Sequence, residues 1–145
     1  MIDVIELENL HLAIIIRSNY SSEGISFFTN ENDPLQLGYM NRPKDYFINP
    51  HSHNKVKREL EDTHEVLFIK SGIVRIDFYN ENHDYLISEI LKQGDVVLLT
   101  EGGHGFKIIE NAEIIEVKQG PYIGEKDKNR FAAVEDSEVI YRITK

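Results

Sequence analysis

A chain of 145 residues, 41% of them hydrophobic, is long enough to bury the core of a single domain. It contains no cysteine, which excludes disulfides, zinc fingers, iron–sulfur clusters and a thiol nucleophile. The formal net charge of −9 argues against a general nucleic-acid binder, because such proteins must neutralise phosphates. The N-terminus lacks the features of a signal peptide, and its apolar run at residues 12–16 is too short to span a bilayer. We therefore expect a soluble cytoplasmic protein with no nucleic-acid or membrane partner.

Short segments rich in Val, Ile, Phe and Tyr, bounded by Gly, Pro, Asn or Asp, follow one another along the chain. In chain order they predict strands at residues 12–17, 24–29, 36–41, 46–53, 65–70, 74–79, 85–91, 95–99, 105–109, 113–118 and 139–143. Hairpin turns are predicted at residues 71–72, 80–84 and 110–112. Many short strands with little helical pattern indicate one all-β domain, a sandwich or a barrel.

Two histidines lie two residues apart in the predicted strand 46–53, within Pro50-His51-Ser52-His53. In a strand, such residues point to the same face, about 7 Å apart at their Cα atoms. A third histidine, His104, lies in a glycine-rich turn where small neighbours allow close approach to a shared centre. Imidazole and carboxylate are natural ligands for Zn, Mn, Fe and Ni, and a chain without thiolates must use them. The sequence therefore predicts a site for a divalent transition metal.

A carboxylate is expected to complete this site, and Glu65 is the best candidate because a charged group at the start of an apolar strand needs a partner. The residues after it are apolar on both faces, so strand parity does not decide between Glu65 and His64. Glu59 and Glu61 are alternative fourth ligands. Glu65 is alternatively a structural ion-pair partner of Arg58.

Two motifs in the central third of the chain resemble those of the cupin superfamily. The first is the His51-Ser52-His53 triplet followed by Glu65 and, with the family's six-residue spacing, Gly72. The second begins at Gly94-Asp95 and ends at the glycine-flanked His104. The eleven residues between His53 and Glu65 exceed the family's usual gap, and Thr100 stands where its second motif has proline. The resemblance implies a double-stranded β-helix, or jelly-roll barrel, with His51, His53, Glu65 and His104 as metal ligands.

On this basis residues 1–145 are predicted to form a single cupin-like domain. Residues 46–118 form the core with both motifs, and residues 119–145 form a closing loop and terminal strand. The resemblance also implies a homodimer, with strands among residues 1–30 at its interface. Residues 12–16 and 139–143 are the candidate edge strands for that pairing, since bare edges are usually covered.

The resemblance implies an isomerase, epimerase or related enzyme that acts on a carbohydrate, a sugar nucleotide or a hydroxy or keto acid. His64 or Tyr79 is the predicted catalytic base. Predicted ligand contacts are Arg58, a forked donor, together with Gln36, Tyr39 and Tyr122 near the barrel mouth. The alternative function is a non-catalytic sugar-binding module.

Two basic clusters have two interpretations each. Lys55, Lys57 and Arg58 form one cluster, and Lys126, Lys128 and Arg130 form the other. Each cluster is either solvated surface charge or a contact for a small anionic ligand.

Overall fold

The structure is a computed structural model that describes residues 1–143. The chain divides into two compact units. Met1–Tyr20, together with the described residues from Thr63 onward, form the first, which we call the sheet unit. Ser21–Asp62 form the second, which we call the hairpin unit. Residues 144–145 of the predicted terminal segment lie outside the described residues.

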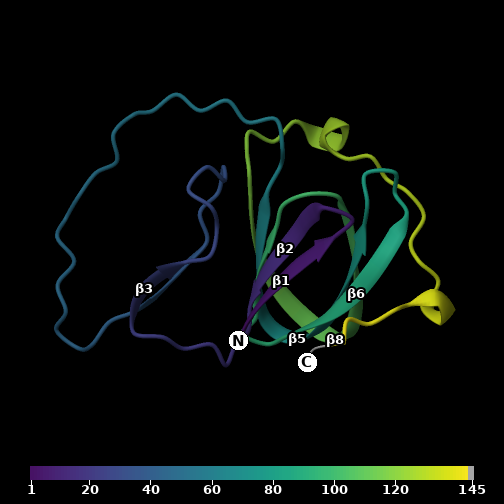
Figure 1. The fold of residues 1–145 in the computed structure, drawn as a ribbon, viewed down its shortest axis with the longest axis horizontal. Coiled ribbons are helices and arrows are strands. Elements are labelled where there is room, and N and C mark those ends of the chain that lie inside the picture. The colour runs from purple at the N-terminus through teal and green to yellow at the C-terminus, as the bar shows by residue number, and fades with distance from the viewer. Residues whose placement is uncertain (144–145) are drawn as a thin grey trace. The chain divides into compact units, whose positions relative to one another are not determined.

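The sheet unit is built on one curled antiparallel sheet (Figure 1). Five strands follow one another across it, in the order β1 (Ile2–Leu7), β2 (Leu10–Ile16), β7 (Val96–Leu99), β5 (Glu65–Tyr79) and β6 (Tyr85–Lys92). The sixth strand, β8 (Gly103–Lys118), pairs with β5 along nearly its whole length. The helical content of residues 1–143 is two short 3₁₀ turns, η1 (Gly124–Asp127) and η2 (Asp136–Glu138). No helix in this range is long and apolar enough to cross a membrane. The prediction of an all-β fold is confirmed.

Strands β5 and β8 bend together near their middles, and this bend shapes the sheet. The β5–β8 register shifts three times between Ile69 and Val74. At the bend Gly72 has φ 83°, and a Cβ atom added there would lie 2.2 Å from the carbonyl oxygen of Asn111. Only glycine accepts both this backbone angle and this close approach. Because of the bend, β5 pairs with β7 at its beginning and with β6 at its end.

Two of the three predicted hairpin turns are therefore wrong. Residues 71–72 and 110–112 lie inside the continuous strands β5 and β8, where bulges carry the turn-forming residues. The third prediction, at residues 80–84, is confirmed. Asn80 closes that turn by donating its backbone N–H to the carbonyl of Asp84 at 3.0 Å, and its side chain accepts the N–H of Asn82.

The hydrophobic core lies on one face of the curled sheet. Alternate β5 residues enter it, and after the register shifts the alternation resumes in the opposite parity, so the core face stays apolar on both sides of the bend. The fully buried members include Ile69, Val74, Ile76, Phe78, Leu91 and Val97. Strand β2 adds Ala13 and Ile15 to the same cluster.

Two predictions about edge strands fail in this sheet. Residues 12–16 lie between β1 and β7 and are hydrogen-bonded on both sides, so they do not form a free edge. Strand β1 was not predicted, and it joins β2 through a tight turn at Glu8 and Asn9, both with positive φ. Residues 139–143 make only an isolated bridge from Tyr141 to Ser88 rather than a strand.

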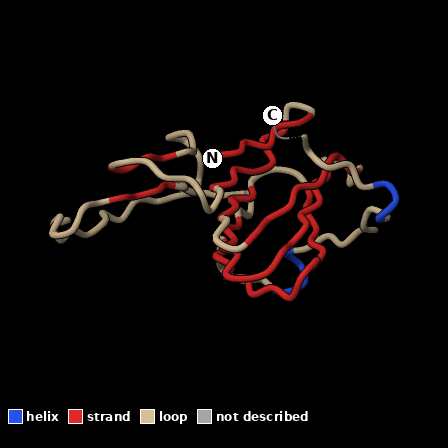
Figure 2. The backbone as a smooth tube through the Cα atoms, turned by 90° about the horizontal axis from the view of Figure 1, so that it is seen from below, coloured by secondary structure: helices blue, strands red, loops and turns tan. Residues whose placement is uncertain are grey.

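The hairpin unit contains two four-residue strands, β3 (Gly24–Phe27) and β4 (Gly38–Asn41), which pair with each other (Figure 2). Both correspond to predicted strands. The predicted strand 46–53 is wrong, because residues 42–64 have no strand structure and residues 43–63 are exposed throughout. Pro50 lacks the N–H that a ladder needs, and Tyr46, Phe47 and Ile48 are consecutive apolar residues rather than alternating ones.

Candidate functional site

The bend in β5 and β8 brings together Glu65 and His104, which are 39 positions apart in sequence. Glu65 opens β5, and His104 lies opposite Phe78 near the other end of the same strand. The His104 Nε2 and Glu65 Oε2 atoms are 3.1 Å apart. The Glu65 side chain is 11% exposed and that of His104 is 29% exposed. The pair is thus half-buried, with one open side.

The Glu65 carboxyl group is held in its ionised form. The hydrogen bond from His104 lowers the pKa of Glu65 and outweighs the effect of burial, which raises it. The positive charges of Lys118 and Lys128 lower the pKa of Glu65 further. An ionised carboxylate only accepts hydrogen bonds, so the Nε2 atom of His104 carries the proton in this pair. The result is a fixed carboxylate–imidazole pair.

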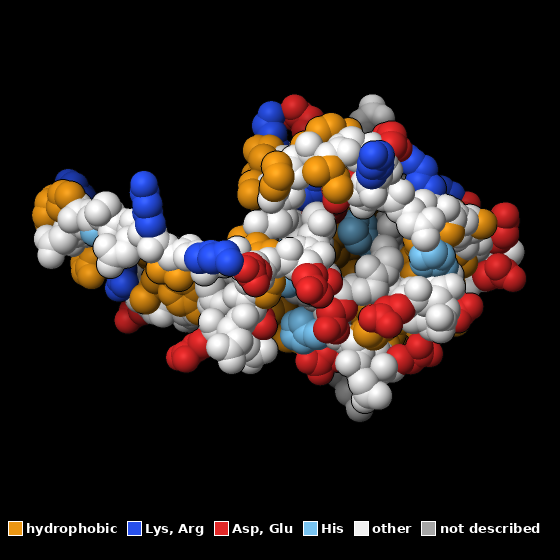
Figure 3. All heavy atoms as spheres, turned by 90° about the horizontal axis from the view of Figure 1, so that it is seen from above, with side chains coloured by type: hydrophobic (Ala, Val, Ile, Leu, Met, Phe, Trp, Pro, Cys, Tyr) orange, Lys and Arg blue, Asp and Glu red, His pale blue; other side chains and the backbone are white. Residues whose placement is uncertain are grey.

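The open side of this pair faces a pocket of about 620 Å³ that lies wholly within the sheet unit. The strands form its floor through Glu65, Tyr79, His104, Phe106 and Glu116. Residues 127–133, downstream of β8, form the opposite side, which we call the C-terminal wall. The volume and the mixture of aromatic and polar lining side chains are typical of a small-molecule site. The face of the molecule in Figure 3 shows acidic side chains gathered around histidine over the sheet unit.

The C-terminal wall is attached to the sheet by several contacts. The Phe131 ring packs edge-on against Tyr79, with centroids 4.9 Å apart, and stacks on His83 at 4.1 Å. The backbone N–H of Val134 donates to the Tyr79 hydroxyl at 3.0 Å. Asp136 accepts a hydrogen bond from the buried Arg75 at 2.9 Å. These contacts fix the wall in place opposite the floor.

The two predicted catalytic residues occupy different positions. Tyr79 lines the pocket, and although its oxygen accepts the Val134 N–H, its hydroxyl proton remains available to donate. His64 is 6% exposed and does not line the pocket, and its buried Nδ1 atom has no hydrogen-bond partner among the described residues. Tyr122 is 73% exposed and lies outside the pocket lining, with the Lys118 ammonium 5.6 Å from its ring centroid.

The remaining predicted site residues belong to the hairpin unit. The His51 and His53 rings are neighbours, with centroids 5.4 Å apart and planes at 80°. The His51 Nδ1 atom is 2.9 Å from the carbonyl oxygen of Asn49. Within the described residues, no group of three or more His, Asp or Glu side chains has the geometry of a metal site. The structure therefore forms two separate pairs of predicted ligands, one in each unit.

The predicted ligand contacts of the hairpin unit make local interactions. The Gln36 side chain donates to the carbonyls of Asn30 and Asp33 and so holds the turn before β4, and Tyr39 lies on β4 itself. The Arg58 guanidinium lies 3.4 Å from the carbonyl oxygen of Val56.

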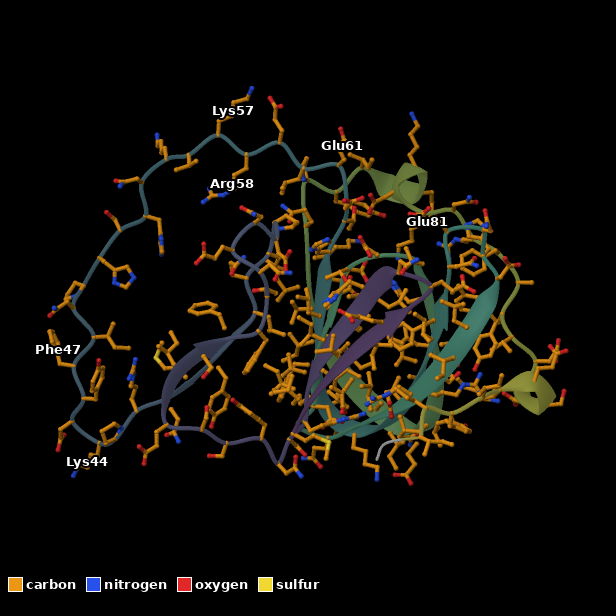
Figure 4. All side chains as sticks on the ribbon, viewed as in Figure 1. Lys44, Phe47, Lys57, Arg58, Glu61 and Glu81 are labelled. Atoms are coloured by element: carbon orange, nitrogen blue, oxygen red, sulfur yellow. The ribbon has the colours of Figure 1, made fainter. Side chains whose placement is uncertain are left out.

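The segment that carries Arg58 is exposed. In Figure 4 the labelled side chains Lys44, Phe47 and Lys57 project outward from it. Of the alternative carboxylate ligands, Glu59 pairs with Lys57, and Glu61 is exposed.

The sequence predicted a closing loop within residues 119–145 but did not place it against the carboxylate–imidazole pair. A second signal was the basic cluster that contains Lys128 and Arg130, and both residues line the pocket. Phe131, which anchors the wall, carried no signal because a lone aromatic residue in a polar loop has no periodicity.

Comparisons with known proteins found no relative of this chain. No protein-family model, curated protein or solved structure matches the chain. The function is therefore argued from the pocket and its residues.

Proposed function

We propose that the chain is a metal-binding protein of the cupin type that acts on a small molecule in the pocket of the sheet unit. The proposed substrate is a carbohydrate or a hydroxy or keto acid, and the proposed reaction is an isomerisation or epimerisation. One observation carries this proposal: two of the four predicted metal ligands, Glu65 and His104, meet at 3.1 Å on the pocket floor. The curled sheet is compatible with one part of a double-stranded β-helix, which we propose as the complete fold.

The geometry of the pair fits a shared divalent ion. Nitrogen and oxygen ligands at bond lengths of about 2.1 Å lie about 3.0–3.4 Å apart around one ion. The observed separation of 3.1 Å falls in this interval. Metal binding requires an ionised carboxylate and a deprotonated imidazole nitrogen, so the ion would replace the proton that His104 shares with Glu65. In this proposal His51 and His53 supply the other two ligands.

The pocket residues suggest how a substrate is handled. A divalent metal held by Glu65 and His104 would supply Lewis-acid chemistry toward a carbonyl or hydroxyl oxygen of the substrate. The Tyr79 hydroxyl, held by Val134, is the group we assign to proton transfer, in preference to His64, which does not line the pocket. Phe106 and Phe131 provide apolar surface for the substrate beside the pair.

A non-catalytic module that binds a small ligand, such as a sugar, is the second candidate. The observation that favours it is the position of His64, because removing this residue from the site leaves Tyr79 as the one predicted base at the pocket. A rigid floor and wall bind a ligand without any proton transfer.

Elemental analysis of tag-free protein purified without chelator tests the metal site. We expect about one equivalent of Zn, Mn, Fe or Ni per chain, since imidazole and carboxylate suit all four ions. Glu65→Ala, His104→Ala, His51→Ala and His53→Ala should each lose most of it. His11→Ala is the matched control, because His11 bonds Glu6 away from the pocket, and it should retain the metal.

The outcomes of this experiment separate the two candidates. If Glu65→Ala and His104→Ala lose the metal but His51→Ala and His53→Ala retain it, the metal lies in the sheet unit and does not use His51 or His53. No metal after reconstitution with all four ions would contradict the metal-dependent enzyme. Ligand binding by that metal-free protein would then favour the binding module. Circular dichroism of each variant checks that its fold is retained.

A further inference from the structure

The floor and the wall of the pocket differ in charge. The carboxylates of Glu65 and Glu116 line the floor. On the wall, Asp127 is compensated by Lys118, whose ammonium lies 3.7 Å from its carboxylate. Lys128 and Arg130 then leave the rest of the wall positive.

Lys128 and Arg130 are available to a ligand. Lys128 forms no ion pair among residues 1–143, although its charge lowers the pKa of Glu65 from across the pocket. Arg130 pairs with Glu125 at 2.8 Å, but both side chains are more than two-thirds exposed, at 71% and 76%. An ion pair this exposed contributes little, so an incoming anion displaces Glu125 easily.

The side chains of Lys128 and Arg130 are suited to bind an anionic group. A guanidinium presents a planar fork of donors that matches a carboxylate or a phosphate, and one of its nitrogens, Nη2 of Arg130, already donates to the Glu125 carboxylate at 2.8 Å. Lys128 lies two positions before Arg130 and adds a point charge. The contacts of Phe131 with Tyr79 and His83 hold this part of the wall on the sheet.

We propose that Lys128 and Arg130 bind a phosphate or carboxylate group of the small molecule that occupies the pocket. This inference rests on the proposed function, because it concerns the same pocket and names the class of its ligand. Both cations lie on the wall, so the anionic end of the molecule lies against the wall. Its uncharged hydroxyl or carbonyl end then lies on Glu65 and His104.

Titration of the wild-type protein with inorganic phosphate, followed by amide NMR, tests this assignment. We expect saturable shifts centred on residues 127–133. Lys128→Ala and Arg130→Ala should each weaken phosphate binding about tenfold, the usual scale for losing a charge-assisted hydrogen bond. The matched control is Lys126→Ala, which removes the same charge from the same loop at a residue that does not line the pocket, and it should bind as the wild type does.

A variant of opposite sign makes the test sharper. Glu125→Gln frees the Arg130 guanidinium from its carboxylate, so it should bind phosphate a few times more tightly than the wild type. A purely structural role for the Arg130–Glu125 pair predicts weaker binding in both variants. A parallel titration with acetate measures the affinity for a carboxylate. The anion that binds more tightly indicates whether the wall takes a phosphate or a carboxylate group.

Some results would overturn the inference. These are the absence of binding by both phosphate and acetate, or equal effects of Lys128→Ala and Lys126→Ala. Neither result bears on the metal content of the wild-type protein, so a failure here is separate from a failure of the metal site. Loss of metal in Glu65→Ala with phosphate binding intact would support both proposals.

Discussion

The two units of this chain carry similar residue types, yet they bury them very differently. In the sheet unit every described strand is paired, and a core with members such as Ile69, Ile76 and Phe78 is almost fully enclosed. In the hairpin unit Leu37 is the one buried hydrophobic residue, while Phe47 is 74% exposed. This difference shows that local β-propensity alone does not make a segment form a buried strand. Backbone pairing and an apolar face to pack against are also required.

The largest effect that tests this comparison comes from one matched pair of truncations. Phe78→Ala removes a side chain that is 1% exposed, so it should lower the free energy of unfolding by about 3–5 kcal/mol. Phe47→Ala removes the same atoms at an exposed position and should change it by less than about 0.5 kcal/mol. Urea denaturation measures both values, and comparable losses would break the comparison.

An intermediate effect is expected from the buried charge network. Asp3 bonds Arg17 at 2.6 Å and Arg142 at 2.8 Å, which ties β1 to the C-terminal segment. Burial raises the pKa of Asp3, but the hydrogen bonds from both arginines outweigh it and leave the pKa below its usual value. Asp3→Asn should therefore cost about 2–3 kcal/mol at pH 7.

The pH dependence of stability checks the same prediction. Because the folded pKa of Asp3 is lowered, its contribution is complete above the unfolded pKa near 3.8 and is lost as the pH falls through the folded value. The difference between wild type and Asp3→Asn should thus shrink on acidification below about pH 4. A gap that stays constant down to pH 2 would contradict this account.

The smallest expected difference between two variants concerns the bend. Gly72 and Gly124 both have positive φ, at 83° and 75°, but a Cβ atom would clash at Gly72 and meets nothing within 4 Å at Gly124. Gly124→Ala should cost about 1 kcal/mol through backbone strain, and Gly72→Ala roughly 1–2 kcal/mol more through the clash. Thermal unfolding measures both. Equal losses would show that the close approach of β5 and β8 contributes nothing.

Much of the fold follows from sequence patterns, but strand continuity does not. Alternation and bounding residues located the segments of β2 to β8. They also split β5 and β8 in two, because Gly72 and Asn111 occupy bulges with the residue types of turns. Strand β1 was missed since its turn uses Glu8 and Asn9 with positive φ rather than glycine. In the opposite direction, apolar residues at positions 46–48 led to a predicted strand at residues 46–53, where Pro50 has no N–H to donate to a ladder.

The site was predictable in part for a similar reason. The meeting of Glu65 and His104 followed from the resemblance of two motifs, and the geometry of the bend supports it. The C-terminal wall was not predictable, because no spacing connects residues 127–133 to β5. Their position depends on individual contacts, such as Phe131 on Tyr79, that only the folded chain reveals.

The placement of β2 between β1 and β7 has a consequence for biosynthesis. Ile16 pairs with Val96, which lies 80 residues later in the chain. At about 5–20 residues per second, a ribosome needs several seconds to add that length. During this interval the β1–β2 hairpin exposes the consecutive apolar residues Ile14, Ile15 and Ile16 on an unpaired edge. The nascent chain therefore carries an uncovered apolar segment, the kind of surface that favours aggregation, before the residues that cover it exist.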